Sequence, residues 1–345
     1  MSDLDTPRPS IYLAQRESSI RRALAELRKR PSAFVALVFL ASLLFVAIFA
    51  EVLASDLPLL LRYQGTTFVM PAATHPPELA GETNASLAPK LGAGDFAIYP
   101  LVRFGPAERT RDGAFTGPSF SRGHPLGTDA EGRDAFARAI YGTRTTVTLA
   151  LACALAFVAL GTLLGAVGGF FGGTIDSLLT RLIETLTAFP PLVLVLAVQA
   201  ILPKPTLTTM LVAIGLIRWP EIARVVRAEI LSAIAQDYVL AARALGASPL
   251  RVLVKHVAPN VKGPVLVAVT FGLTSVVLVE ASLSFLHVGV PADTVSWGEM
   301  LSEVRGKGSA LWLLVAPGVL LFACLAAINA VAEALRDLLD PRPGL

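Results

Sequence analysis

Long apolar runs that are almost free of charge constrain this chain more than any other feature of its sequence. A helix needs about 20 consecutive apolar residues to cross the hydrocarbon core of a bilayer, and each run reaches or approaches that length. Only 16% of the 345 residues are charged, whereas about a quarter of the residues in soluble domains are. The runs are Pro31–Ala50, Thr145–Ile175, Thr185–Ile217, Gly263–Val279 and Ser309–Ala332.

The third run is too long for one crossing and is divided by Pro203, Lys204 and Pro205. We therefore interpret it as two helices joined by a tight turn. The first helix is expected to kink at Pro190 and Pro191, and the second is short for a full span. This brings the total to six transmembrane helices, so the sequence predicts an all-α membrane protein.

Basic residues before the first run predict the orientation. Arginine and lysine outnumber acids in residues 1–33, and such a flank stays in the cytoplasm. A cleaved signal peptide fits less well, because the basic region is too long and no small-residue cleavage site follows. With six crossings, both termini are cytoplasmic. The predicted parts are a cytoplasmic segment 1–33, helix 1 at 34–54, an external insert at 55–140, a helical core at 141–335 with a cytoplasmic loop at 220–262, and a cytoplasmic tail at 336–345.

The stretch Ser55–Arg138 is rich in proline, glycine and mixed charges. So long a connection is uncommon unless it is functional or disordered. Its arginines do not contradict an external location, because loops longer than about 60 residues escape the positive-inside bias. Apolar groups at Leu59–Tyr63 and Ile98–Phe104 predict that the insert folds partly against its neighbours.

The insert ends in a polar glycine turn. Asp129 and Arg133 flank the turn, and Asp134 is placed to cap a short interfacial helix leading into the next run. On these residues alone, a solvated polar approach to the membrane explains the segment as well.

The second run carries glycines at helical spacing, which we interpret as helix packing rather than substrate contact. Small residues four apart let helix backbones approach closely in lipid. The glycines are Gly161, Gly165, Gly168, Gly169, Gly172 and Gly173. Three charged residues then predict a short cytoplasmic turn: Asp176, Arg181 and Glu184.

The stretch Asp237–Asn260 is polar and basic although apolar runs lie on both sides of it. Its apolar spacing predicts one helix that ends at Gly246, because glycine readily adopts the left-handed conformation of helix ends. Ser248 and Pro249 then predict the cap and first position of a second helix, which Pro259 stops. The product is a helix-turn-helix. The alternative is a basic amphipathic helix that lies on the anionic membrane face.

Polar side chains within the later runs are candidates for the transport path or its gate. Glu280 and His287 lie at or near the outer part of the fifth span, and Asn329 lies near the inner end of the last. An ionisable group in a span is a functional candidate by default. The alternative for Glu280 is an interfacial carboxylate paired with a neighbouring helix or a partner subunit.

Several classes of function are excluded by what the sequence lacks. It contains no nucleotide-binding glycine loop, no zinc spacing and no nucleophile motif, so no catalytic residue and no metal site is expected. Cys153 and Cys324 lie inside apolar runs and are interpreted as buried small hydrophobes. Nothing in the charge distribution implies a nucleic acid. If ATP drives this protein, another subunit must bind it.

Two motifs resemble those of dipeptide and oligopeptide permeases, the membrane subunits of binding-protein-dependent ABC importers. Near the second run, the matching groups are Gly127-Thr128-Asp129, Gly132-Arg133-Asp134 and Tyr141-Gly142-x-Arg144. In the cytoplasmic loop, Ala241, Ala242, Gly246 and the group Val257-Ala258-Pro259 match the segment that engages the ATPase. The chain departs from that pattern at Leu240, where an acidic residue is usual, and at Ala258, where leucine is usual. His287 likewise stands where a glycine is common.

The resemblance implies a type I ABC importer fold and a C-type permease subunit. It implies four kinds of neighbour: a second permease subunit, two ATPases that bind ATP and magnesium, a periplasmic or lipid-anchored substrate-binding protein, and the bilayer of the inner membrane. It also implies which residues contact the ATPase. These are Leu240, Ala241, Ala242, Leu245, Gly246, Ala247, Ser248, Pro249 and Pro259.

The substrate implied by the resemblance is a dipeptide or oligopeptide, and the similarity of SDLPLLLRYQG to the oligopeptide and microcin C subgroup favours a longer peptide. Nickel complexes or another small solute remain the alternative, because their permeases share these motifs. A secondary transporter is disfavoured, since the runs are poor in buried charge and show no internal repeat. A channel or structural membrane protein would not need the cytoplasmic helix-turn-helix.

Overall fold

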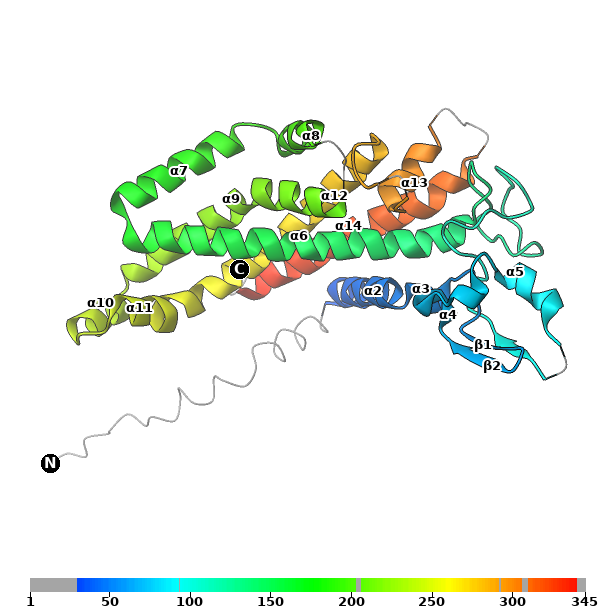
Figure 1. Cartoon of the computed structure of the whole chain (residues 1–345). Helices are drawn as coiled ribbons and strands as arrows, with labels where there is room; N and C mark the ends of the chain where they lie inside the picture. The colour runs from blue at the N-terminus through cyan, green and yellow to red at the C-terminus, as the bar shows by residue number, and fades with distance from the viewer. Residues whose placement is uncertain (1–29, 93, 203–205, 292, 306–309, 340–345) are drawn as a thin grey trace.

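The computed structural model describes residues 30–92, 94–202, 206–291, 293–305 and 310–339 (Figure 1). The described chain is mainly helical, and its long helices run side by side along one direction. They are α2 (Pro31–Ile48), α6 (Ala135–Phe171), α9 (Leu207–Ile234), α12 (Ala258–Phe285) and α14 (Trp312–Leu339). The shorter helices are α3 (Ala50–Leu53), α4 (Pro71–Thr74), α5 (Asn84–Leu87), α7 (Gly173–Thr187), α8 (Pro191–Ile201), α10 (Asp237–Ala244), α11 (Pro249–Arg251) and α13 (Trp297–Glu303), with a π-helical turn η4 (Val252–Val257) and 3-10 turns η2 (Pro77–Leu79) and η3 (Ala88–Lys90).

Four of these helices are long and apolar enough to cross a membrane, namely α2, α6, α12 and α14. A fifth crossing results if α7 and α8 count as one span, although they are bent by 86°. The kink expected at Pro190 and Pro191 is therefore a complete break between two helices. The turn expected at Pro203–Pro205 lies outside the described residues.

Two predictions about the third run and its surroundings are wrong in detail. Residues 176–184 do not form a turn: Asp176, Arg181 and Glu184 lie within α7. The chain instead turns at Gly172, whose φ of +66° ends α6. The helix expected to stop near Ile217 continues through Pro220 to Ile234 as α9, so the loop expected from residue 220 begins inside a helix.

Close packing of α6 against α9 explains the glycines of the second run. A Cβ atom on Gly165 would lie 2.5 Å from the carbonyl oxygen of Ala223, and one on Gly161 would lie 2.7 Å from that of Trp219. One on Gly169 would lie 3.0 Å from the carbonyl oxygen of Arg227. Because glycine has no Cβ, the two backbones can touch over three successive turns. The prediction of helix packing is confirmed for these three glycines.

Residues 55–134, called here the connecting segment, join α3 to α6 and carry a small antiparallel sheet. Its strand order is β2 (Thr66–Val69), β1 (Leu60–Tyr63), β3 (Phe96–Ile98), with Leu60 opposite both Val69 and Ile98. Successive strand residues point to opposite faces, so Leu61 faces inward, where it packs with Leu79 and Leu87. The expected packing of the two apolar groups in this segment is confirmed, but the prediction of an all-α chain is wrong. A local signal was present, because only Gln64 and Gly65, both with positive φ, separate β1 from β2.

The connecting segment and the stretch 237–257, called here the tip, lie at opposite ends of the molecule (Figure 1). Helix α6 has 37 residues and is therefore about 55 Å long at 1.5 Å per residue. It runs from the connecting segment to the end where α10 and α11 lie. The fold thus separates the two sets of predicted site residues by the length of a long helix.

Candidate functional site

The tip is built from α10, a glycine turn and α11. The N–H of Gly246 donates to the carbonyl of Arg243 at 3.0 Å, and the N–H of Ala247 donates to that of Ala242 at 3.0 Å. This pair of bonds requires the residue after the cap to be left-handed, and Gly246 has a φ of +81°. The predicted helix, glycine turn and second helix are confirmed.

The second helix of the tip differs from the prediction at both ends. Ser248 takes the cap position but its side chain makes no capping hydrogen bond within the described chain. Pro249 stands at the first helical position, as expected. Pro259 does not stop the helix: the chain stays helical from α11 through the π-helical turn η4 into α12, and Pro259 is the second residue of α12.

Large apolar side chains of the tip face outward. Leu245 is 88% exposed and Leu240 is 51% exposed, while Leu250 is also exposed and only Val239 of α10 is buried. Exposed apolar side chains grouped on one surface mark a site of contact with another molecule. Ala241, Ser248 and Pro249 are also exposed, and Ala242 and Ala247 are half-buried, so these predicted contact residues are accessible at the tip. Pro259 is exposed too, but it lies in α12.

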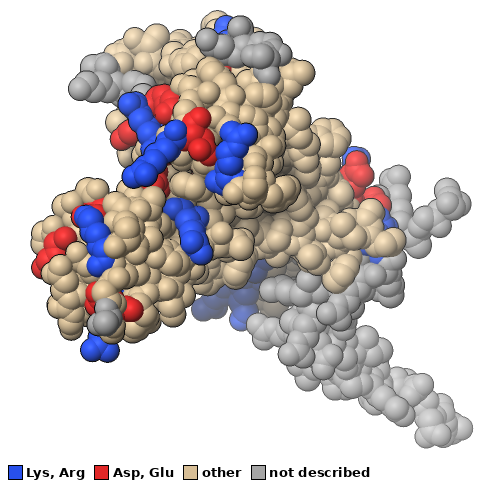
Figure 2. Space-filling view, turned by 90° about the vertical axis from the view of Figure 1, so that its right-hand side faces the viewer, with Lys and Arg blue, Asp and Glu red and all other residues tan. Residues whose placement is uncertain are grey.

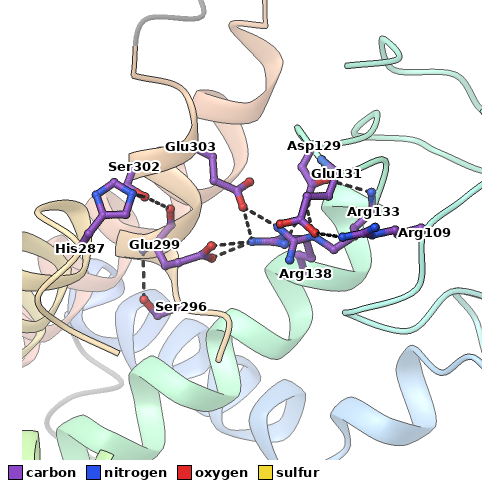
Figure 3. A network of polar contacts seen from close by, with 10 residues as sticks. All are labelled: Arg109, Asp129, Glu131, Arg133, Arg138, His287, Ser296, Glu299, Ser302 and Glu303. Carbon is purple, nitrogen blue, oxygen red and sulfur yellow. Dashed lines mark hydrogen bonds and ion pairs between the residues drawn. The ribbon is translucent and has the colours of Figure 1, made fainter. Parts of the chain in front are cut away.

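At the opposite end, Arg138 of α6 lies within a cluster of carboxylates (Figure 3). Its side chain is 1% exposed. Its Nη1 atom lies 2.8 Å from Asp129 Oδ2, and its Nη2 atom lies 2.7 Å from Glu299 Oε2 and 2.9 Å from Glu303 Oε1. Because Glu299 and Glu303 belong to α13, Arg138 joins the end of the connecting segment to the hairpin between α12 and α14.

Arg133 makes a second connection of the same kind. Its Nε atom lies 2.7 Å from Asp129 Oδ2, and its Nη2 atom lies 2.7 Å from Glu303 Oε1. Arg109 and Glu131 add a more exposed pair at 2.7 Å. Seen from this end, Figure 2 shows basic and acidic side chains gathered together beside surface that carries neither.

The buried part of this cluster has one negative charge in excess, since Asp129, Glu299 and Glu303 share two guanidinium groups. Burial raises the pKa of Glu303 to about 8, and the neighbouring carboxylates of Glu299 and Asp129 add to this shift while Arg138 opposes it. A carboxyl with such a pKa binds a proton near neutral pH, which relieves the excess charge.

The other predicted residues of this region serve the same junction. Gly132 has a φ of +78° and its N–H donates to the carbonyl of Asp129, so the predicted glycine turn is confirmed. Asp134 caps α6 by accepting from the N–H of Ala137 at 2.7 Å. No separate interfacial helix precedes the span, because α6 starts at Ala135 and is continuous.

Two further motif residues also make long-range contacts. A Cβ atom on Gly127 would lie 2.5 Å from the carbonyl oxygen of Thr116 and 2.7 Å from Nε1 of Trp312, so α14 approaches this turn closely. Arg144 lies 2.8 Å from Glu51 of α3. The predicted motif therefore ties the connecting segment, α3, α6 and α14 together.

Three residues of this cluster were not predicted from the sequence: Arg138, Glu299 and Glu303. A signal existed, because Glu299 and Glu303 are four residues apart after the helix cap Ser296, and Arg138 follows Asp134 by four residues. Residues at this spacing share one face of a helix. Their pairing could not be predicted, because it depends on how α13 lies against α6.

Glu280 is an interior residue of α12, with 1% of its surface exposed. The hydroxyl of Ser284 donates to its Oε1 at 2.9 Å, and that of Thr146 in α6 lies 3.4 Å from its Oε2. Asn329 of α14 accepts from the hydroxyl of Thr274 at 3.1 Å. Both residues hold neighbouring helices together through hydrogen bonds, which agrees with the alternative of a paired carboxylate for Glu280.

His287 ends α12 in a left-handed conformation, with a φ of +63°. Its N–H donates to the carbonyl of Ser284, and the N–H of Val288 donates to that of Leu283, as in the glycine turn of the tip. This geometry explains why glycine suits the position. Its Nε2 atom lies 3.3 Å from the hydroxyl of Ser302 in α13. Cys153 and Cys324 are both free and buried, as expected.

Comparisons with known proteins identify two matching family models. The family described as "Binding-protein-dependent transport system inner membrane component" matches residues 158–344, which is more than half of the chain. The family described as "N-terminal TM domain of oligopeptide transport permease C" matches residues 18–77. The two matches lie on either side of most of the connecting segment.

Individual relatives match over similar ranges. The dipeptide transport system permease protein of Haemophilus influenzae is 36% identical over 247 residues, which cover 70% of this chain and 83% of the relative. The dipeptide transport system permease protein of Alkalihalophilus pseudofirmus is 31% identical over 323 residues, covering 93% and 90%. The oligopeptide transport system permease protein of Bacillus subtilis is 37% identical over 223 residues, covering 64% and 73%.

Proposed function

Because the chain belongs to the family of binding-protein-dependent transport system inner membrane components, we propose that it is a permease subunit that carries peptides across the membrane. The family model fixes the class: a multi-pass protein of the inner membrane that forms the membrane part of an ABC transporter and not its ATPase. The peptide substrate is supported by relatives named as dipeptide and oligopeptide permeases. Nickel complexes or another small solute are the alternative substrates.

We propose six crossings. Beside α2, α6, α12 and α14, the bent pair α7 and α8 forms one, because α8 alone would reach only about 16 Å of the roughly 30 Å hydrocarbon core. Helix α9 forms the other. This count places the tip and both termini in the cytoplasm and the connecting segment outside. A contact of 2.5 Å between Arg30, before α2, and Asp337, near the end of α14, supports a common side for the two termini.

The exposed leucines of the tip carry the functional proposal. An apolar surface built on a rigid turn at the cytoplasmic end suits a groove on a partner ATPase, which would bind ATP and magnesium. Leu240 adds apolar area at a position where the ATPase-binding motif that this loop resembles has an acid, so contact here depends on burial rather than on an ion pair. A second permease subunit, two ATPases and an external substrate-binding protein complete the proposed assembly.

In this assembly, the permease switches between two packed arrangements. Closure of the ATPase pair on ATP pushes the tip, and the loaded binding protein engages the opposite end. The ATP-bound ATPase pair and the loaded binding protein each favour the arrangement of the permease that they bind more strongly. Glu280, His287 and Asn329 then act on transport through the helix contacts that they hold, which makes them gating candidates rather than substrate ligands.

Copurification with the ATPase tests the tip. Replacing Leu245 with Asp in the full complex should release the ATPase, because a carboxylate cannot enter an apolar groove without a large desolvation cost. The matched control is Leu101→Asp, since Leu101 is 77% exposed but belongs to the connecting segment. Retention of the ATPase by the Leu245→Asp protein would contradict the proposed contact.

A further inference from the structure

The connecting segment contains a polar pocket of about 280 Å³ that the contacts described so far do not use. Residues from three stretches line it: 83–86, 104–112 and 122–124. The rings of Phe104 and His124 lie against each other at its base, with their centroids 4.5 Å apart. His124 is buried, so the pocket has a fixed floor beneath an exposed rim.

Positive charge at this rim is not neutralised by an ion pair with any residue that the structure describes. Arg111 and Arg122 line the pocket, are exposed, and form no ion pair with any of the described residues. Arg109 is different, because Glu131 lies 2.7 Å from it. Two guanidinium groups at the same pocket therefore have no carboxylate partner in the described part of the chain.

Each of the two acidic residues of the pocket has a polar neighbour other than an arginine. The carboxylate of Glu108 accepts from the N–H of Gly105 at 3.2 Å, and burial raises the pKa of Glu108. The carboxylate of Asp112 lies 3.4 Å from Nε2 of His124, on the floor. The pocket thus offers two free guanidinium groups to a ligand, and a guanidinium matches a carboxylate through two parallel hydrogen bonds.

We propose that this pocket binds the carboxylate of a small ligand on the outer side, such as the C-terminus of a short peptide. Its volume suits one terminal residue rather than a whole peptide, because sites that enclose drug-sized ligands have about 300–1,000 Å³. The choice of a peptide carboxylate rests on the proposed function, whereas the carboxylate chemistry rests on Arg111 and Arg122 alone.

The pocket is also connected to helix α6. Nδ1 of His124 lies 2.7 Å from Oδ2 of Asp134, and Oδ1 of Asp134 accepts from the N–H of Ala137 at 2.7 Å. A ligand that displaces Asp112 from His124 therefore acts on the residue that caps α6. Ligand binding in the pocket is thus linked to the N-terminus of a transmembrane helix through the two contacts of Asp134, one with His124 and one with Ala137.

Calorimetric titration of the full chain in nanodiscs, without partner subunits, tests the site. The probes are trialanine with a free C-terminus and trialanine amide, which differ only in the carboxylate. The amide should bind at least about tenfold more weakly, because hydrogen bonds to charged groups contribute more than neutral ones. Arg111→Gln and Arg122→Gln should each weaken the binding of trialanine to a similar extent. Arg62→Gln is the matched control, since Arg62 is an exposed arginine of β1 away from the pocket.

Equal binding of acid and amide would overturn the proposal, as would unchanged affinity in both pocket variants. If trialanine does not bind, but the pocket variants lose binding of the substrate-binding protein, the occupant is a protein side chain and the small-ligand site is wrong. A titration that contradicts the carboxylate site does not contradict the permease function, because the titration does not measure transport. Conversely, if the complex imports no peptide but the titration gives the expected result, the carboxylate site is supported and the proposed peptide transport is wrong.

Discussion

The Nη2 atom of Arg138 lies 2.9 Å from Oε1 and 2.7 Å from Oε2 of Glu299, although the two residues are 161 positions apart in the chain. Through this contact and those to Asp129 and Glu303, one buried guanidinium fastens α13 to α6. Replacing Arg138 with Gln would leave Glu299 without its guanidinium partner, and Asp129 and Glu303 with Arg133 alone. Removal of one member of a buried ion pair costs about 3–5 kcal/mol. We expect a loss of that size in the free energy of unfolding, measured by denaturant titration in mixed micelles.

Removing a carboxylate together with the arginine provides the control for this prediction. The double variant Arg138→Gln, Glu299→Gln should be more stable than Arg138→Gln alone, because one unpaired buried charge is gone. If the single variant unfolds like the wild-type protein, the cluster does not hold the two helices together.

The raised pKa of Glu303 predicts a dependence of stability on pH. The pKa is about 8 in the folded protein against an ordinary value of 4.5, so the folded state binds more protons between these values. The stabilisation from this proton is fully present below pH 4.5 and is lost as the pH rises through 8. The midpoint of unfolding should therefore fall as the pH is raised from 5 to 9. Glu303→Gln should flatten that decline, and an equally steep decline in the variant would exclude Glu303 as its source.

Contact between α6 and α9 predicts that Gly165 cannot be enlarged. Gly165→Ala puts a Cβ 2.5 Å from a backbone oxygen of α9, so the helices must separate. Overpacking of this kind costs about 1–3 kcal/mol, which the same denaturant titration can resolve. Gly318→Ala on α14 is the matched control. Nothing lies within 4 Å of its added Cβ, and its stability should be unchanged or higher.

The left-handed conformation of His287 predicts a stabilising substitution. His287→Gly removes a strain of about 1–2 kcal/mol, at the cost of a long contact of 3.3 Å to Ser302. We expect the free energy of unfolding, measured by thermal denaturation, to rise by about 1 kcal/mol. His287→Ala separates the two effects, because it loses the Ser302 contact and keeps the strain. If glycine and alanine lower stability equally, the histidine contact matters more than the backbone.

Features that depend on neighbouring residues could be predicted from the sequence. Gly246 ends α10, Asp134 caps α6 and the glycines of α6 pack against another helix, because each is determined within one or two turns of chain. In the sheet, β1 and β2 form a hairpin across Gln64 and Gly65, a local signal that was missed. The pairing of β1 with Phe96–Ile98 could not be predicted, because that strand lies more than thirty residues away. The end of α9 was misplaced since Pro220 is accommodated inside a packed helix. The contacts of Arg138 required knowledge of which helices lie together, which one sequence does not contain.

Peptide-stimulated ATP hydrolysis by the assembled complex in liposomes tests the central claim most directly. The complex would receive its binding protein loaded with a peptide pool or with a nickel chelate, and would carry either the wild-type chain or Gly246→Leu. We predict stimulation by peptides only, and its loss in the variant, because leucine disfavours the φ of +81° that shapes the tip. Full stimulation and transport in Gly246→Leu would contradict the role of the tip, and stimulation by the nickel chelate alone would contradict the peptide substrate.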